Sequence, residues 1–164
     1  VVIEAEAGVN QPVTPGKEWT VVEDEKASGG KALRAPTGAR RTAEDPLDAP
    51  VLYRIQFRQP GRYSLYYRGR NSGKPGNKGS DSLFLGRGFG PDAAMGNSGL
   101  SESGEYQWRL GGRFVVLPAD TEKPLEYRID CRETAAHLDV MVFSQKRNLH
   151  EEEGALDKLI GLGQ

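Results

Sequence analysis

The sequence predicts an all-β protein, a β-sandwich of two antiparallel sheets followed by a short C-terminal helix. Apolar and polar residues alternate with a period of two in several short runs, a pattern typical of strands with one buried face. The 21 glycines and 10 prolines indicate many turns, and no helical periodicity precedes residue 148. Because 37% of the 164 residues are hydrophobic and apolar runs recur throughout, we expect one folded domain.

The expected strands follow one another along the whole chain. They are predicted at 1–6, 19–23, 31–35, 51–57, 63–67, 83–85, 106–109, 113–118, 125–131 and 138–144. The turn Gln59-Pro60-Gly61-Arg62 lies between two of them and predicts a β-hairpin over 51–68, since Pro presets one φ and Gly accepts a positive φ. We expect the sandwich to occupy residues 1–146 and a helical tail or linker to occupy 147–164.

The tail and two long loops are the remaining features of the organisation. A short amphipathic helix in the tail would place Leu156, Leu159 and Ile160 on one side, and it would either pack on the sandwich or lead into a following module. The glycine-rich stretches 69–79 and 86–105 predict long loops. Because long loops in a compact domain are commonly functional, we expect a ligand there.

The residue content argues against catalysis and against nucleic-acid binding. The chain has two histidines and one cysteine, and it contains no nucleophile elbow, zinc-protease, phosphate-loop or dinucleotide motif. We therefore expect no enzyme. The net charge of −1 and the lack of a recognition element disfavour nucleic acid. Cys131 lies in an alternating strand pattern, so a buried thiol is expected.

Further expectations concern the chain's surroundings. No apolar stretch approaches the ~20 residues that cross a bilayer. The chain begins on the strand-like residues Val1-Val2-Ile3 without an initiator methionine, and we interpret it as a module of a longer polypeptide. Any targeting signal would then lie outside it.

Carboxylates near the two ends of the chain predict a cation site. On a strand, Glu4 and Glu6 would project to the same face, and Asp139 would join them if the first and last strands meet. The turn Ser28-Gly29-Gly30-Lys31 can direct backbone carbonyls inward. Such hard oxygen ligands suit Ca²⁺. On spacing alone, a solvated edge strand explains the two glutamates equally well.

An ordered set of segments resembles carbohydrate-binding modules of families 6 and 35 and related galactose-binding-like sandwiches, over roughly residues 1–145. These segments are Glu4-Ala5-Glu6, Ser28-Gly29-Gly30-Lys31, Pro60-Gly61-Arg62-Tyr63-Ser64-Leu65-Tyr66, Gly79-Ser80-Asp81-Ser82-Leu83-Phe84-Leu85, Tyr106-Gln107-Trp108, Arg132-Glu133 and Leu138-Asp139. The resemblance implies a jelly-roll sandwich. It also implies a structural calcium ion at Glu4, Glu6, Ser28, Lys31 and Asp139.

The resemblance further implies a sugar site in loops at one end of the sandwich, with an aromatic platform and a polar residue before the final strand. Tyr106 and Trp108 match the aromatic segment, and an indole face suits the C–H face of a pyranose. Packing in the core is an equally open role for Trp108. Where many relatives have Asn before the Leu-Asp pair, this chain has Ala136 and His137, which departs from the usual sugar contact.

Basic residues extend the expected ligand site. The segment 68–71 carries Arg70 and Asn71, and arginine can form bidentate contacts with a carboxylate or sulfate, so an acidic or sulfated glycan is predicted. Arg70 pairing with Asp81 or a tail glutamate is the alternative. Arg132 and His137 are the other expected ligand contacts.

Two functions follow. The first is a non-catalytic carbohydrate-binding module tethered to other modules of a larger polysaccharide-active enzyme, secreted or periplasmic, with structural Ca²⁺. The second is a structural or protein-interaction sandwich without sugar binding.

Overall fold

The computed structural model describes residues 1–37, 49–71 and 81–162. The strands are β1 (Val2–Glu4), β2 (Val9–Asn10), β3 (Thr20–Glu23), β4 (Lys31–Arg34), β5 (Val51–Ile55), β6 (Gly61–Arg70), β7 (Ser82–Gly86), β8 (Met95–Gly99), β9 (Gln107–Val116), β10 (Leu125–Cys131) and β11 (His137–Ser144). The helical elements are the 3₁₀ turns η1 (Ala5–Ala7), η2 (Ser28–Gly30), η3 (Pro118–Thr121) and η4 (Leu149–Glu151) and the α-helix α1 (Ala155–Leu159).

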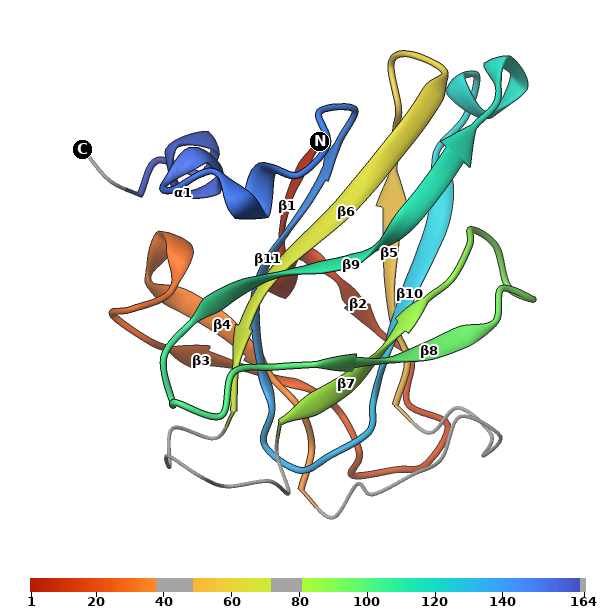
Figure 1. The fold of residues 1–164 in the computed structure, drawn as a ribbon. Helices are drawn as coiled ribbons and strands as arrows, with labels where there is room; N and C mark the ends of the chain where they lie inside the picture. Colours follow the sequence, from red (N-terminus) through yellow and green to blue (C-terminus); the bar gives the residue numbers. More distant parts are fainter. Residues whose placement is uncertain (38–48, 72–80, 163–164) are drawn as a thin grey trace.

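The described strands form two antiparallel sheets that pack face to face (Figure 1). One sheet has the order β3-β4-β11-β6-β9 with β1 also paired to β11, and the other has the order β2-β5-β10-β7-β8. From β4 onward, successive strands are distributed between the sheets as 4-11-6-9 and 5-10-7-8, which is the jelly-roll arrangement. The predicted all-β sandwich with a short C-terminal helix is confirmed.

The first and last strands meet, which is the condition under which the sequence groups Asp139 with Glu4 and Glu6. β1 pairs antiparallel with β11, with Val2 opposite Val142 and Glu4 opposite Val140. β4 pairs with the beginning of β11, at His137. Residues almost 140 positions apart in the sequence therefore lie side by side.

The predicted hairpin over 51–68 is wrong, because β5 and β6 belong to different sheets. Both strands alternate with a period of two, and that pattern is the same whichever sheet a strand joins. The connection crosses from one sheet to the other and places Phe57 in the core, fully buried. The Phe57 ring packs edge-on against Tyr63 and Phe143, with centroids 4.8 and 5.6 Å apart.

Other elements also differ from prediction. The two strands expected at 106–109 and 113–118 are one strand, β9, with an irregularity where it passes β6. The expected loop 86–105 contains β8. The first strand ends at Glu4 rather than at Glu6, which lies in η1. Of the other expected loop, 69–79, the first two residues belong to β6, and residues 72–79 lie outside the described residues.

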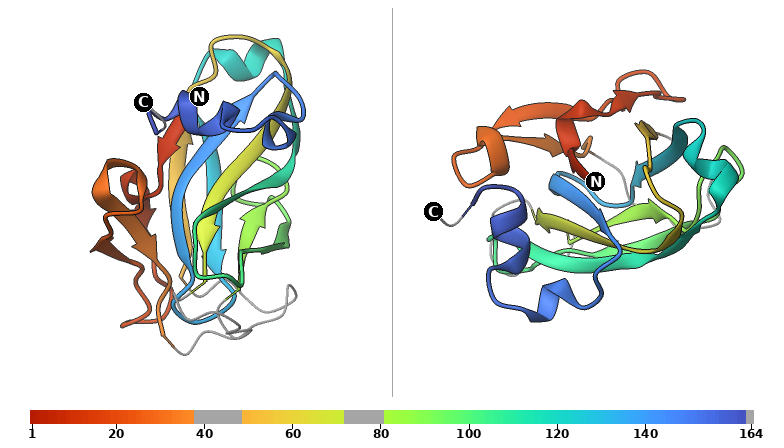
Figure 2. Two further views of the ribbon diagram at one scale, coloured as in Figure 1. Left: turned by 60° about the vertical axis from the view of Figure 1, so that its left-hand side comes forward. Right: turned by 90° about the horizontal axis from the view of Figure 1, so that it is seen from above.

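The core lies between the sheets, and a second apolar cluster lies outside them. Cys131 is fully buried in the main core, as expected. On the outer face of the six-stranded sheet, Tyr66 and Val142 pack against Leu149 and Leu156 of the tail. Figure 2 shows the tail lying along that face. The tail therefore docks on the sandwich.

The helix of the tail has a narrower apolar side than expected. Leu156 is 2% exposed, whereas Leu159 is 50% exposed. Among the described residues, no helix is long and apolar enough to span a membrane.

Candidate functional site

The structure brings Glu4, Ser28 and Asp139 together beneath the junction of β1 and β11. The Ser28 backbone N–H donates to Asp139 Oδ1 at 2.8 Å, and the Ser28 hydroxyl donates to Glu4 Oε1 at 3.2 Å. The turn has the backbone that its glycines permit, with φ of 60° at Gly29 and 75° at Gly30. Lys31 follows as the first residue of β4, and its backbone N–H donates to the Ser28 carbonyl.

The electrostatics of this acidic cluster are unusual. Glu4 Oε2 and Glu6 Oε2 are buried and have no hydrogen-bond partner among the described residues. Burial raises the pKa of Glu4, and the neighbouring charges of Glu6 and Asp139 raise it further. Burial also raises the pKa of Asp139, although Arg68 donates to its carboxylate and opposes the shift.

The donor set of the cluster fits a hard cation, because it consists of carboxylate and hydroxyl oxygens. Within the described ranges, no three Asp, Glu, His or Cys side chains already form a metal-holding group. The fit rests instead on the two unpartnered carboxylate oxygens and on the glycine turn beside them. Glu4 and Glu6 approach the cluster from β1 and η1 and not from one strand face.

A second polar cluster lies at the loop end of the sandwich, where β6 ends and β7 begins. Glu133 is its centre and is 4% exposed. Its carboxylate accepts the Ser82 hydroxyl at 2.7 Å and the Asp81 backbone N–H at 3.0 Å, and Arg132 Nη1 donates to it at 3.0 Å. The Arg132 side chain remains 30% exposed. Asn71 lies nearby, fully buried, and its amide donates to the Glu102 carbonyl at 3.1 Å.

The two carboxyl groups of this loop-end cluster titrate differently. Burial, with the hydrogen bond and charge of Glu133, raises the pKa of Asp81 to about 6. Burial also acts to raise the pKa of Glu133, but the Ser82 hydrogen bond and the Arg132 charge outweigh it and lower that pKa. As the pH falls toward 6, the first proton that the pair takes up is therefore held on Asp81 rather than on Glu133.

Arg70 and Tyr106 are engaged within the protein. Arg70 Nη2 and the Tyr106 hydroxyl donate to Asp24 Oδ2 at 2.7 and 2.8 Å. The guanidinium carbons of Arg68 and Arg70 lie 4.9 and 5.1 Å from the centroid of the Tyr106 ring. Burial acts to raise the pKa of Asp24, but the hydrogen bonds from Arg70 and Tyr106 outweigh it and lower the value. Arg70 thus pairs with Asp24, and neither of the expected acidic partners was the right one.

Trp108 lies in β9 under the docked tail. Its indole N–H donates to Asp157 Oδ1 at 2.8 Å, and the ring packs against the outer apolar cluster. This placement favours the packing role that the sequence left open for Trp108.

His137 is placed at the start of β11 and is 7% exposed. Burial and the nearby Arg70 charge lower its pKa to about 4, so the imidazole is neutral at pH 7. Its Nδ1 is buried without a hydrogen-bond partner in the described part of the chain.

The sequence matches no protein-family model and no curated protein. Solved structures do match. The family 35 carbohydrate-binding module from Clostridium thermocellum has a TM-score of 0.57 at 15% identity, covering 88% of this chain and 98% of that chain. The C-terminal family 6 module of a marine laminarinase from Zobellia galactanivorans has a TM-score of 0.58 at 12% identity, again covering 88% and 98%.

The chain has the fold of the family 6 and family 35 carbohydrate-binding modules. The same fold occurs within larger enzymes. An exo-β-1,3-galactanase from Phanerochaete chrysosporium matches 88% of this chain with a TM-score of 0.58 at 15% identity. This chain spans only 29% of that enzyme. The resemblance read from the sequence is therefore confirmed at the level of the fold.

Proposed function

We propose that the chain is a non-catalytic carbohydrate-binding module of a larger, secreted or periplasmic polysaccharide-active enzyme. The observation that carries the proposal is the match to two carbohydrate-binding modules over 98% of their own length, against 29% of an enzyme. The names of those proteins describe carbohydrate binding or action on a glycan. The shared fold supports a glycan-binding role for this chain. Such a module raises the local concentration of its enzyme on the polymer without any covalent step.

The glycan binds at the loop-end cluster. Arg132 carries exposed donors on a side chain that Glu133 and Ser82 hold in place. Asp81, partly exposed beside it, supplies an acceptor and, when protonated, a donor. A rigid polar group of this kind suits sugar hydroxyls, which both donate and accept. Both loop-end arginines pair with an acid, but the Arg132 side chain is 30% exposed and that of Arg70 only 15%, so Arg132 is the one offered to a carboxylate or sulfate on the sugar.

A structural Ca²⁺ ion is the second part of the proposal. Glu4, Glu6 and Asp139 would hold it with carbonyls of the 28–31 turn. The ion would neutralise three acids that are otherwise compensated by Arg68 alone among the contacts described. It would fasten the first strand to the last.

A sandwich that binds protein rather than sugar is the second candidate. One observation favours it: Tyr106 and Trp108, the two aromatic residues expected as a sugar platform, are both engaged by acids of the protein itself.

Binding to an array of neutral, uronic-acid and sulfated polysaccharides tests the proposed function. We expect binding to at least one glycan and a loss of affinity of about tenfold or more in Arg132→Ala, because charge-assisted hydrogen bonds are lost. Arg58→Ala removes an exposed arginine elsewhere and is the matched control, which should bind like the wild type. If the wild type binds no glycan, the protein-interaction candidate replaces this one.

Chelation tests the proposed ion separately. Ca²⁺ at a hundred times its dissociation constant should stabilise the fold by about 2.7 kcal/mol. The melting temperature should therefore fall on chelation and recover on adding Ca²⁺. Glu4→Gln/Glu6→Gln should abolish this response. A wild-type melting curve that chelation leaves unchanged contradicts the ion site.

A further inference from the structure

The outer face of the six-stranded sheet carries an arginine cluster that the loop-end site does not use. Arg62 from β6, Arg113 from β9 and Arg147 from the segment after β11 line one cavity of about 270 Å³. The β6–β9 register places Arg62 opposite Val115 and Ser64 opposite Arg113, so these four residues share the outer face. We call Arg62, Arg113 and Arg147 the outer-face arginine cluster.

The charge of this cluster is uncompensated. The residues that line the cavity include three arginines and no acid; the others are Tyr63, Ser64, Phe114 and Val115. All three arginines are exposed, and within the described residues none of them forms an ion pair. Three like charges gathered in one cavity repel one another, and an anion relieves that repulsion.

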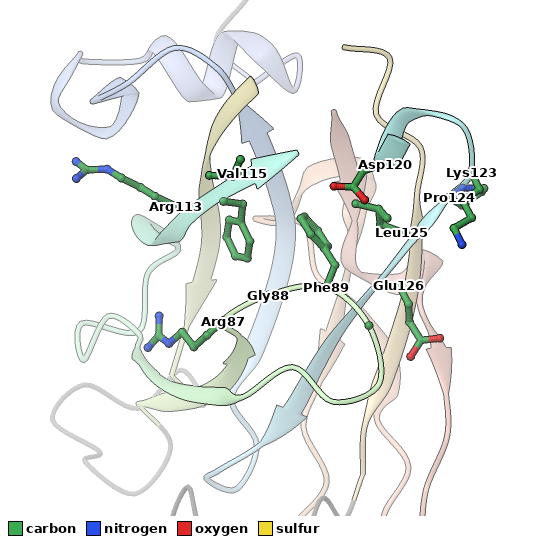
Figure 3. Close-up of a pocket in the computed structure, with 12 residues that line it drawn as sticks. Arg87, Gly88, Phe89, Arg113, Val115, Asp120, Lys123, Pro124, Leu125 and Glu126 are labelled. Atoms are coloured by element: carbon green, nitrogen blue, oxygen red, sulfur yellow. The ribbon is translucent and has the colours of Figure 1, made fainter. Parts of the chain in front are cut away.

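Comparison with a neighbouring cavity shows why we assign an anion preference to the 270 Å³ cavity. A hollow of about 520 Å³ on the other side of β9 also includes Arg113. In Figure 3 Arg87 and Arg113 extend on one side of that hollow, and Asp120 and Glu126 lie on the other side. Its mixed charge gives no clear preference for an anion, whereas the 270 Å³ cavity presents one sign of charge.

We propose that the outer-face arginine cluster is a second binding site, which takes a carboxylate or sulfate group carried by a glycan. Guanidinium groups match the planar or tetrahedral oxygens of such anions. The exposed side chain of Val115 offers apolar contact to the ring that bears the anion. The cavity is close to the lower limit of about 300 Å³ for small-ligand pockets, so it suits one charged sugar unit.

The second site lies at a distance that one polymer chain can bridge. Strand β6 runs from Arg62 at this site to Arg70 near the loop-end cluster, and eight residues of strand span roughly 26 Å. A polymer that reaches both sites would bind more tightly than to either one, by effective concentration. The glycan nature of the ligand rests on the proposed function, whereas the anion preference rests on the arginine cluster.

Titration with three probes tests the proposal: an oligogalacturonate, a sulfated oligosaccharide and a neutral oligosaccharide of similar length. The variants are Arg113→Gln/Arg147→Gln and the control Arg54→Gln/Arg58→Gln, which removes two exposed arginines elsewhere and changes the net charge equally. We expect the first variant to lose about tenfold or more in affinity for one or both anionic probes. The control should lose less than about twofold, and the anionic affinity should weaken with salt. The two anionic probes separate a carboxylate site from a sulfate site.

Two results would overturn the second site. One is equal loss in both variants, which indicates non-specific attraction, and the other is no loss in either. The Arg132→Ala variant separates the test of the second site from the test of the proposed function. It should weaken glycan binding at the loop end and leave the preference of the outer-face arginine cluster for anionic probes unchanged. Neutral-glycan binding without any anion effect refutes the second site only, and glycan binding that Arg132→Ala leaves unchanged refutes the loop-end site only.

Discussion

The two ends of strand β6 carry arginines that differ in burial and in ion pairing. Arg68 and Arg70, toward the loop end, have side chains that are 13% and 15% exposed and pair with Asp139 and Asp24. Arg62, at the other end, is exposed beside Arg113 and Arg147 without an ion pair in the described chain.

The difference shows that a basic sequence segment does not by itself mark an anion site. Paired, partly buried arginines stabilise the fold, because removing one partner leaves a charge with poor solvation. Exposed, unpaired arginines contribute little to stability and are free for a ligand. Mutations in the two regions should therefore have opposite consequences.

The largest effect should come from breaking the paired region. Asp24→Ala leaves the Arg70 guanidinium and the Tyr106 hydroxyl without their carboxylate, and we expect a loss of about 3 kcal/mol in the free energy of unfolding. Urea denaturation measures this. Arg113→Gln, from the unpaired region, should change stability by less than about 0.5 kcal/mol. Equal losses in the two variants would remove the distinction between the regions.

The docked tail sharpens the comparison, because it begins beside Arg147. Leu156→Ala should cost about 2 kcal/mol, since it empties a buried position in the outer apolar cluster. Trp108 fluorescence should shift to longer wavelength as the indole gains water. Leu159→Ala is the control on the same helix, and its 50% exposed side chain predicts almost no change. Identical behaviour of the two variants would mean that the tail does not hold this face.

A smaller effect concerns pH, and it distinguishes two acids. The pKa of Asp24 is lowered in the fold, so its stabilisation is present above the unfolded value of 3.8 and is lost as the pH falls. The pKa of Asp81 is raised to about 6, so its stabilisation is present below 3.8 and is lost as the pH rises through 6.

Melting temperatures between about pH 2 and about pH 8, which extend about two units below 3.8 and above 6, test the sign of each effect. Relative to the wild type, Asp81→Asn should gain stability as the pH rises through 6. Asp24→Asn should lose its deficit as the pH falls below 4. The same slope in both variants would contradict the opposite shifts.

The sequence was sufficient for the β-sandwich, because period-two alternation and the turn residues are local signals. The pairing of the first and last strands entered only as a condition of the cation site, and the structure shows it. The sequence did not predict to which of the two sheets each strand belongs. The segment 51–68 reads as a hairpin, yet Phe57 lies in the core and the chain crosses between sheets there. Only the three-dimensional packing of that ring separates the two arrangements.

Some residues of the candidate sites could be predicted from the sequence and others could not. Glu4, Ser28 and Asp139 could be grouped from the sequence on the condition that the first and last strands meet, and the structure fulfils that condition. The role of Trp108 could not be predicted from the sequence, because its hydrogen-bond partner Asp157 comes from the tail, 49 residues away. The outer-face arginine cluster was also missed, since its members come from three separate segments and each reads as an ordinary solvated position.

The most direct test of the account is nuclear magnetic resonance of the labelled protein titrated with glycans. Glycan binding at the loop end predicts shifts in the backbone amides of Ser82, Arg132 and Glu133. Anionic glycans should in addition shift the amides of Ser64 and Arg113, and neutral glycans should not. Spectra that no glycan changes, or shifts confined to residues outside both clusters, would contradict the account.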